Sequence, residues 1–331
     1  GLRASWIAVF LMVTSPFFLG MSGTGMNHSL NAVLLLGVAS LLIPMSRPLQ
    51  SREAWRRGLF AGMLLGWAVT TRPLTAVAHS AVWLVIWIVM LASAGPTGGP
   101  RRRDIRRQGL WVMAGLVPAA VVFMLYNFKT TGHPLTLAYQ LSNPDLHQVG
   151  FWDSNELDFG PVDALHHMAA NIFALNWILF GWPIGSMVVL CIWWFRTRFS
   201  RPEICMVALI AVQSTLYAAY QFHDLLLGPR FLYDLFPMLV ILSSMALAGM
   251  TRGRPTRLRV LWAVIILFAV GGMISSYAHW SARFIRPAER CRHFGRFMEQ
   301  VEPLSRPTVI VMPRPYHEVH GLHFQHQRFK D

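Results

Sequence analysis

Two arginines stand apart from the other basic residues of this sequence. Arg72 lies in Thr-Thr-Arg-Pro-Leu-Thr and Arg230 in Leu-Gly-Pro-Arg-Phe-Leu-Tyr, so each adjoins a proline that favours a turn. Each also lies at the end of an apolar segment, where a guanidinium is costly unless it extends to the lipid head groups or meets an anion. The planar guanidinium donates bidentate hydrogen bonds that suit phosphate. Contact with a phosphate and extension toward the membrane surface both stay open as interpretations of these arginines at this point.

Three other side chains are candidate substrate contacts: His28, His133 and Tyr139. His28 lies in Met-Asn-His-Ser, where Asn27 or Ser29 can cap the helix that follows. Capping explains this polar group as well as a substrate contact does, so both interpretations stay open. The carboxylates between residues 127 and 170 need no special role in a solvated loop, and we assign no catalytic acid or base to them. These carboxylates are Asp145, Asp153, Glu156, Asp158 and Asp163.

No metal or cofactor site is expected from the sequence. Histidines recur every third residue from His317 to His326, as in some metal-binding tracts, but no cysteine accompanies them and a surface cluster is the favoured interpretation. Cys191 and Cys205 fall in apolar segments, and Cys291 stands alone. Gly-rich phosphate loops, G-x-S-x-G and H-E-x-x-H are absent from the sequence. The chain therefore lacks the local signatures of soluble enzymes.

The composition sets the class of protein. Of 331 residues, 54% are hydrophobic and 13% are charged, and the mean hydropathy is +0.42. Such a chain cannot cover itself with a polar surface, so its apolar side chains must face lipid. The formal net charge of +14 is spread over several short segments rather than gathered on one face. Nucleic-acid binding is therefore not expected.

Nine apolar segments predict an all-α polytopic membrane protein. A span needs roughly 20 apolar residues to cross about 30 Å of hydrocarbon, and it must be helical to pair its backbone polar groups. The third and fourth segments form one apolar run, interrupted by a tight turn at Thr70–Pro73. The nine expected spans are Ala4–Gly20, Ser29–Met45, Gly58–Thr70, Leu74–Ala94, Gly109–Tyr126, Asn171–Phe195, Ile204–Phe222, Arg230–Met250 and Val260–Trp280.

The distribution of arginines predicts how the spans are oriented. Sixteen arginines lie in four short segments, 46–57, 95–108, 196–203 and 251–259. Short basic loops stay in the cytoplasm, and here they alternate with segments that carry few basic residues. Those segments, which include the long loop 127–170, are expected to form the extracytoplasmic face of a multi-pass protein of the inner membrane.

We expect two parts in the chain. Residues 1–280 form the multispan domain, with 127–170 as its outer loop. Residues 281–331 form an extracytoplasmic tail or the start of a small α/β domain, because 288–301 has the pattern of an amphipathic helix and 308–312 that of a buried strand. Anionic lipid head groups are the expected partners of the arginines that begin this tail.

Several short motifs follow one another along residues 10–250. They are Ser15–Phe18, Gly62–Gly66, Thr71–Pro73, Tyr126–Asn127, Thr131–Leu135, Asn176–Pro183 and Gly228–Phe231. In their order and in their placement on the expected outer face, they resemble motifs of bacterial GT-C membrane glycosyltransferases. The resemblance is to the protein O-mannosyltransferase and aminoarabinose transferase type, glycosyltransferase family 39.

This resemblance implies an enzyme that takes a sugar from a polyprenyl-phosphate carrier and passes it to a glycan, lipid or protein acceptor on the extracytoplasmic face. No cofactor is implied. It places Arg72 and Arg230 near the lipid phosphate and the catalytic acidic residue in an outer loop upstream of Gly1. We therefore expect an N-terminally truncated chain that is inactive alone. The alternative is a transporter or flippase for a lipid-linked glycan or solute, which needs polar residues through the middle of the bilayer.

Overall fold

The computed structural model describes residues 1–24, 26–43, 51–94, 99–138, 141, 149–153, 158–195, 199–220, 228–251 and 256–277. The chain divides into two compact units, Gly1–Met273 and Ile274–Asp331. Nearly all of the described residues belong to the first unit. The helix expected at 288–301, the strand expected at 308–312 and the α/β segment that they would form lie outside the described residues.

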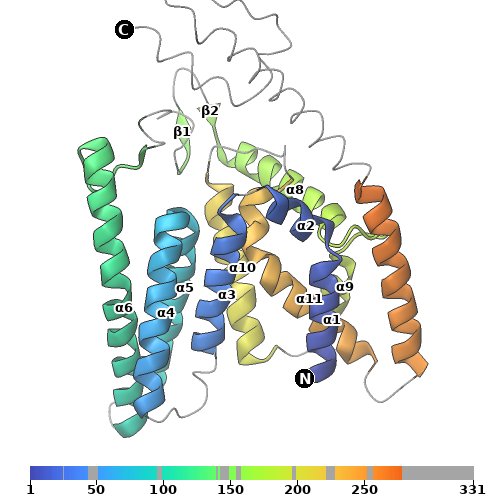
Figure 1. The fold of residues 1–331 in the computed structure, drawn as a ribbon, viewed down its shortest axis with the longest axis horizontal. Helices are drawn as coiled ribbons and strands as arrows, with labels where there is room; N and C mark the ends of the chain where they lie inside the picture. The colour runs from blue at the N-terminus through green and yellow to red at the C-terminus, as the bar shows by residue number, and fades with distance from the viewer. Residues whose placement is uncertain are drawn as a thin grey trace, which may run out of the picture. The chain divides into compact units, whose positions relative to one another are not determined.

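Helices dominate the described residues, as the composition predicted (Figure 1). In chain order they are α1 (Leu2–Val13), α2 (Pro16–Gly23), α3 (His28–Leu42), α4 (Ser51–Thr71), α5 (Pro73–Ser93), α6 (Gly99–Thr131), α8 (Pro161–Ile178), α9 (Val188–Trp194), α10 (Arg201–Ala218), the 3-10 helix η2 (Arg230–Leu235) and α11 (Phe236–Met250). A further helix covers Thr256–Tyr277. The short strands β1 (Trp152–Asp153) and β2 (Asp158–Phe159) pair antiparallel.

Within the described residues, four helices are long and apolar enough to cross a membrane. They are Pro73–Ser93, Arg102–Thr131, Arg230–Met250 and Thr256–Tyr277. The bent pair of α1 and α2, whose axes meet at 53°, raises the number to five if it forms one span. The structure therefore shows a helical chain with several helices suited to a membrane, and the nine spans predicted from the sequence are not found.

The other expected spans are short or broken for local reasons. The span expected at Asn171–Phe195 is not one continuous helix, because α8 ends at Ile178 and α9 begins at Val188. Between them Gly181 and Gly185 have φ of 68° and 82°, a backbone conformation that side chains with a Cβ rarely adopt. α1 and α2 are separated at Ser15, whose hydroxyl accepts from the backbone N–H of Phe18 and so caps α2. α3 contains 15 residues, which is short for a span.

Aromatic packing fixes the segment that carries Arg230. Tyr233 of η2 is 1% exposed and lies between two phenylalanines. Its ring centroid is 5.1 Å from that of Phe17 and 5.8 Å from that of Phe236. Burying a large apolar side chain contributes about 1.5–3 kcal/mol, so η2 is held firmly against α2 and the start of α11.

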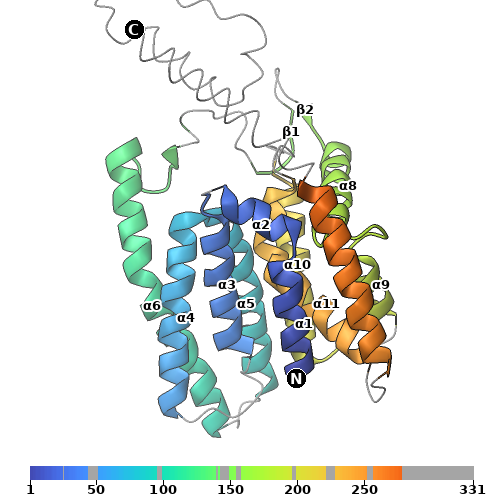
Figure 2. The ribbon, with the colours of Figure 1, turned by 45° about the vertical axis from the view of Figure 1, so that its right-hand side comes forward.

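Glycines spaced four apart line the contact between α4 and α6. α4 lies between α6 and α3 in both views (Figure 1, Figure 2), and Gly58, Gly62 and Gly66 lie along one face of it. A Cβ added to Gly62 would lie 2.1 Å from the carbonyl oxygen of Val112 in α6, and one added to Gly115 would lie 2.3 Å from a carbonyl oxygen of α4. Small residues at this spacing let helix backbones approach closely in membranes. The two helices therefore pack backbone against backbone.

We expect Gly62→Ala to destabilise the protein by about 1–3 kcal/mol, because the added methyl group must displace backbone atoms rather than a flexible side chain. Thermal unfolding in detergent micelles measures the effect. Gly249→Ala is the matched control, since a Cβ there meets no atom within 4 Å and alanine favours a helix. Equal melting temperatures for the two variants would contradict the tight packing of α4 on α6.

The basic ends of α4 and α6 lie at the same end of the first unit. Figure 1 shows the start of both helices there, while the turn from α4 to α5 lies at the opposite end, near α2 and α8. This arrangement agrees with the arginine pattern, which separates a basic face from a face that carries few basic residues.

Topology reporters test the predicted orientation. We expect fluorescent-protein fusions after Arg57 and after Arg107 to be active in the cytoplasm, because these positions follow arginine-rich loops. Alkaline-phosphatase fusions at Ser154 and Ser305 should be active on the outside. An outside signal at Arg107 would overturn the orientation.

Candidate functional site

A buried polar cluster lies where α4 ends and α5 begins. Arg72 separates the two helices with φ of −145° and ψ of 82°, outside the α-helical region that a following proline disfavours. Pro73 takes the first position of α5, where the missing N–H costs nothing. This is the tight turn that the sequence predicted. It directs the side chain of Arg72 inward, and the residue is 9% exposed.

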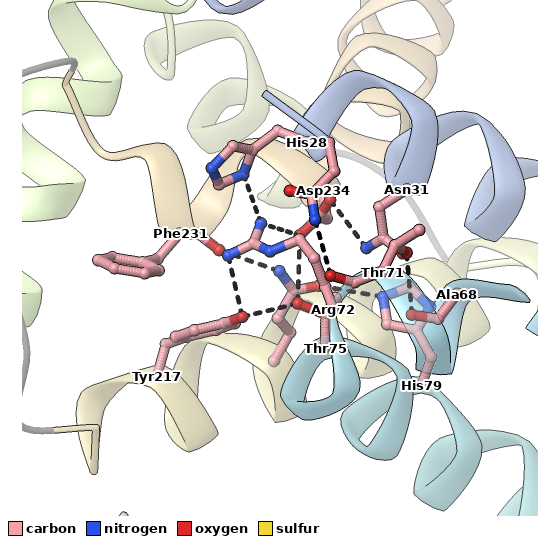
Figure 3. Close-up of polar contacts among 12 residues, drawn as sticks. His28, Asn31, Ala68, Thr71, Arg72, Thr75, His79, Tyr217, Phe231 and Asp234 are labelled. Carbon is pink, nitrogen blue, oxygen red and sulfur yellow. Dashed lines mark hydrogen bonds and ion pairs between the residues drawn. The ribbon is translucent and has the colours of Figure 1, made fainter. Parts of the chain in front are cut away.

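The guanidinium of Arg72 contacts three side chains from three other elements (Figure 3). Its Nη1 forms an ion pair with Oδ2 of Asp234 in η2, and it donates to Nδ1 of His28 in α3 at 2.6 Å. Its Nη2 donates to the hydroxyl of Tyr217 in α10 at 3.1 Å. From the sequence, the expected partner of Arg72 was a phosphate or the lipid surface. In the structure the protein itself supplies an anion, and the phosphate contact stays a prediction.

Asp234 is fully buried, and other donors share in binding its carboxylate. Thr75 Oγ1 donates to Oδ2 at 3.2 Å, and Asn31 Nδ2 donates to Oδ1 at 3.0 Å. Asn31 in turn accepts from the hydroxyl of Thr71 at 3.0 Å, and the hydroxyls of Thr75 and Tyr217 are 2.7 Å apart. A buried charge needs this degree of compensation. The cluster consequently ties α3, α4, α5, α10 and η2 together.

Arg72 fixes the tautomer of His28. A guanidinium is always a donor, so Nδ1 of His28 accepts from it and the neutral ring carries its proton on Nε2. Burial lowers the pKa of His28 from 6.5 to about 3, and the positive charges of Arg72 and Arg230 add to this shift. His28 therefore stays neutral and offers one N–H donor of fixed position. Asn27 does not cap α3 with its side chain, which donates to the carbonyl of Thr71 instead.

The guanidinium groups of Arg230 and Arg72 both lie close to the aromatic ring of Phe231. The Cζ atom of Arg230 lies 5.2 Å from the ring centroid of Phe231, and Cζ of Arg72 lies 5.8 Å from the same centroid. Phe231 also stacks on Tyr217, with centroids 5.4 Å apart. Guanidinium groups at these distances are attracted to the π face of a ring. The structure thus brings together the two arginines that the sequence singled out.

A second polar pair lies further along α5. Nε2 of His79 is 3.0 Å from Oε1 of Gln213 in α10, and the amide of Gln213 donates to the carbonyl of Phe231 at 3.2 Å. His79 is seven residues beyond Arg72, or about 10 Å along the helix axis. The next residues on the same side of α10, Leu209 and Met206, are apolar and buried. The row of polar contacts between α5 and α10 ends at His79.

The other two candidate substrate contacts are His133 and Tyr139, of which the structure describes His133. His133 is exposed beyond the end of α6, where its Nδ1 accepts from the backbone N–H of Leu135 at 3.3 Å. Tyr139 lies outside the described residues. Of the two candidates that the structure describes, His28 lies beside Arg72 and His133 does not.

The other groups weighed for chemistry have local roles or cannot be placed. Asp163 accepts from the backbone N–H of Gly160 at 2.9 Å and so caps α8. Asp145, Glu156, Cys291 and the histidines from His317 to His326 lie outside the described residues. In the part of the chain that the structure describes, no three His, Cys, Asp or Glu side chains gather as a metal site would require.

Four residues of the cluster were not predicted from the sequence: Asp234, Tyr217, Asn31 and Thr75. One signal for Asp234 was present, because a carboxylate inside an apolar segment marks a functional position and implies a partner. That partner, Arg72, is 162 residues away in the sequence, so spacing alone could not pair them. Asn31, Thr75 and Tyr217 look like ordinary polar residues of helices until the fold places them around the ion pair.

Comparison of the chain with protein-family models, with curated proteins and with solved structures found no match.

We expect the stability of the protein to fall as the pH drops from 6.5 toward 3, in part through His28. Because the pKa of His28 is lower in the folded chain than in the unfolded chain, the unfolded chain takes up the proton first. The stability that the neutral ring contributes is present above pH 6.5 and is lost as the pH falls. Thermal unfolding in detergent between pH 7.5 and pH 5 measures this dependence.

His28→Gln should make that pH dependence shallower, since the amide oxygen still accepts from Arg72 but does not titrate. The matched control is His133→Gln at an exposed histidine, which should leave the dependence as it is. Identical pH profiles for the parent and His28→Gln would show that His28 is not held neutral by the fold.

Proposed function

We propose that this protein is a glycosyltransferase of the bacterial inner membrane. It takes a sugar from a polyprenyl-phosphate carrier and transfers it to a glycan, lipid or protein acceptor on the extracytoplasmic face. The observation that carries the proposal is the meeting of Arg72, Arg230 and His28 at one end of the helices. The motif resemblance to GT-C glycosyltransferases supports it independently.

The reaction explains why cationic groups would gather there. When the bond between the sugar and the phosphate oxygen breaks, negative charge develops on the departing phosphate while the sugar carbon becomes more positive. Donors that are already in place stabilise this charge without reorganising. Arg72 is held by three side chains, and His28 presents its Nε2–H beside it, so both are fixed before a substrate arrives.

The substrate also suits the division between polar and apolar surfaces. A polyprenyl phosphate has one charged head and a long apolar tail. The cluster at the start of α5 can meet the head, while the tail can lie along helices whose exposed side chains are apolar, such as Leu84 and Val85 of α5. A tail of this kind needs no enclosed pocket, because the lipid itself solvates it.

The proposal includes the finer topology inferred from the sequence. α3, α4 and α10 are shorter or more polar than the four clear candidates. In the same unit, α4 packs on α5 and α6, α10 packs on α5, and α3 packs on α4. We propose that these three helices also cross the membrane, as do the bent pair α1–α2 and the interrupted pair α8–α9, which together with the four candidates gives the nine spans predicted from the sequence. The cluster then lies near the outer surface and the tail beyond residue 280 is extracytoplasmic.

One observation weighs against the alternative of a transporter or flippase. A transport path needs polar groups across the whole bilayer. Between α5 and α10 the polar row covers about 10 Å, roughly a third of the hydrocarbon thickness, and it ends against Leu209 and Met206. A polar row closed at one end suits a site for a lipid head group better than a path.

We expect Arg230→Ala to weaken the binding of a polyprenyl monophosphate about tenfold to a hundredfold, since a charge-assisted hydrogen bond contributes about 1.5–3 kcal/mol. Arg72→Lys should weaken it less, because lysine keeps the charge but loses the planar fork. In a preparation that transfers sugar, Arg230→Ala should lower turnover by about 10² to 10³. Binding can be measured by native mass spectrometry of protein released from detergent micelles.

Arg106→Ala is the matched control for these variants. Arg106 is an exposed arginine of α6 near its basic end, and it should not affect binding of the phosphate. A folded Arg230→Ala protein that binds the lipid as tightly as the parent would remove the phosphate assignment of Arg230 and favour the transporter alternative.

A further inference from the structure

We propose that Asp234 sets which phosphate ester the site prefers: it favours a phosphodiester, which carries one negative charge, over a phosphomonoester, which carries up to two. The inference rests on the proposed function, in which a lipid phosphate binds beside Arg72. It assigns Asp234 a role in specificity rather than in bond breaking.

Any anion bound at Arg72 must share the guanidinium with the carboxylate of Asp234. Nη1 of Arg72 already bonds to Asp234 and to His28, and Nη2 bonds to Tyr217 (Figure 3). These contacts occupy three of the five N–H donors of an arginine. A phosphate therefore meets a guanidinium whose charge is already partly balanced.

The carboxylate of Asp234 is held in place beside Arg72. Its side chain is 0% exposed, and Thr75 and Asn31 donate to its two oxygens. η2, which carries it, is held by the rings of Phe17 and Phe236 around Tyr233. The carboxylate consequently stays beside Arg72 when a ligand binds, and its negative charge stays with it.

The two kinds of phosphate ester differ in their negative charge. Repulsion between Asp234 and a bound phosphate is proportional to the charge on the phosphate. A phosphodiester carries one charge at any neutral pH, whereas a phosphomonoester loses its second proton near pH 6 and carries almost two charges at pH 8. The attraction of Arg72 and Arg230 acts on both esters, and the fixed repulsion from Asp234 reduces it more for the monoester.

This selectivity matches the direction of the proposed reaction. The sugar donor is a phosphodiester. In the transfer, the acceptor oxygen forms a bond to the sugar carbon, the electron pair of the broken carbon–oxygen bond stays on the phosphate oxygen, and the hydroxyl proton of the acceptor passes to a base. The polyprenyl product is then a phosphomonoester with one more negative charge. Asp234 therefore favours binding of the donor and release of the spent carrier.

The test measures the affinity of the purified protein at pH 8 for two lipids with the same polyprenyl tail. One is the polyprenyl methyl phosphate, a diester, and the other is the polyprenyl monophosphate; the uncharged polyprenol serves as the blank. The parent protein should bind the diester more tightly. Asp234→Asn should raise affinity for the monoester on the order of tenfold more than affinity for the diester, the size of effect expected for one charge a few ångströms away at intermediate dielectric.

Two further variants separate charge from structure. Asp234→Glu keeps the charge and should keep the preference for the diester. Glu203→Gln removes another buried carboxylate, which caps the start of α10 and is not part of the cluster, and the ratio of the two affinities should not change.

The outcomes distinguish the inference from the function on which it rests. If the parent binds neither ester better than the polyprenol, the proposed function fails and the inference fails with it. If both esters bind but the parent prefers the monoester, or a folded Asp234→Asn protein keeps the parental ratio, the role of Asp234 is wrong while the phosphate site stands. Should Asp234→Asn not fold, the preference of the parent protein decides the matter.

Discussion

The buried ion pair between Arg72 and Asp234 is the constraint on which the rest of the site depends. Removing two charges from water costs several kcal/mol per ion, and their attraction offsets this cost only when the geometry is good and the remaining polar atoms are bonded. Here Asn31 and Thr75 bond to the carboxylate, and Tyr217 bonds to the guanidinium. Asn31 belongs to α3, Thr75 to α5 and Tyr217 to α10. Their helices must therefore keep a fixed rotation and height relative to one another.

This requirement explains how early and late parts of the chain are joined. The ion pair connects residues 162 positions apart, and Phe17 packs on Tyr233 in the same region. The contact between α4 and α6 is of another kind, because it depends on glycines rather than on polar groups. Small residues bring two backbones together without fixing a buried charge. Polar contacts thus define the region around Arg72, while steric fit holds the outlying helix α6.

The sequence predicted what depends on local chemistry and missed what depends on distant partners. Composition predicted the helical class, and Pro73 predicted the turn at Arg72. The distribution of charge set Arg72 and Arg230 apart from the arginines of the basic loops. The break between α8 and α9 depends on positive φ at Gly181 and Gly185. An apolar pattern does not reveal such a backbone conformation, so the sequence predicted one continuous helix there. Asp234 was visible as a carboxylate in an apolar segment, but nothing in the spacing pointed to its partner.

The position of the ion pair says more about function than its strength says about stability. Well-packed apolar side chains of similar volume often stabilise a protein as much as a buried ion pair does. A chain that needed only a stable contact between α5 and η2 could use the kind of packing found at Leu209 and Met206. Instead, charged and neutral hydrogen-bonding groups gather at the start of α5. Further along the contact between α5 and α10, the next buried side chains of α10 are the apolar Leu209 and Met206. This asymmetric distribution supports the proposed ligand, a lipid with a charged head and an apolar tail, because the two ends of such a lipid need different surroundings at different depths.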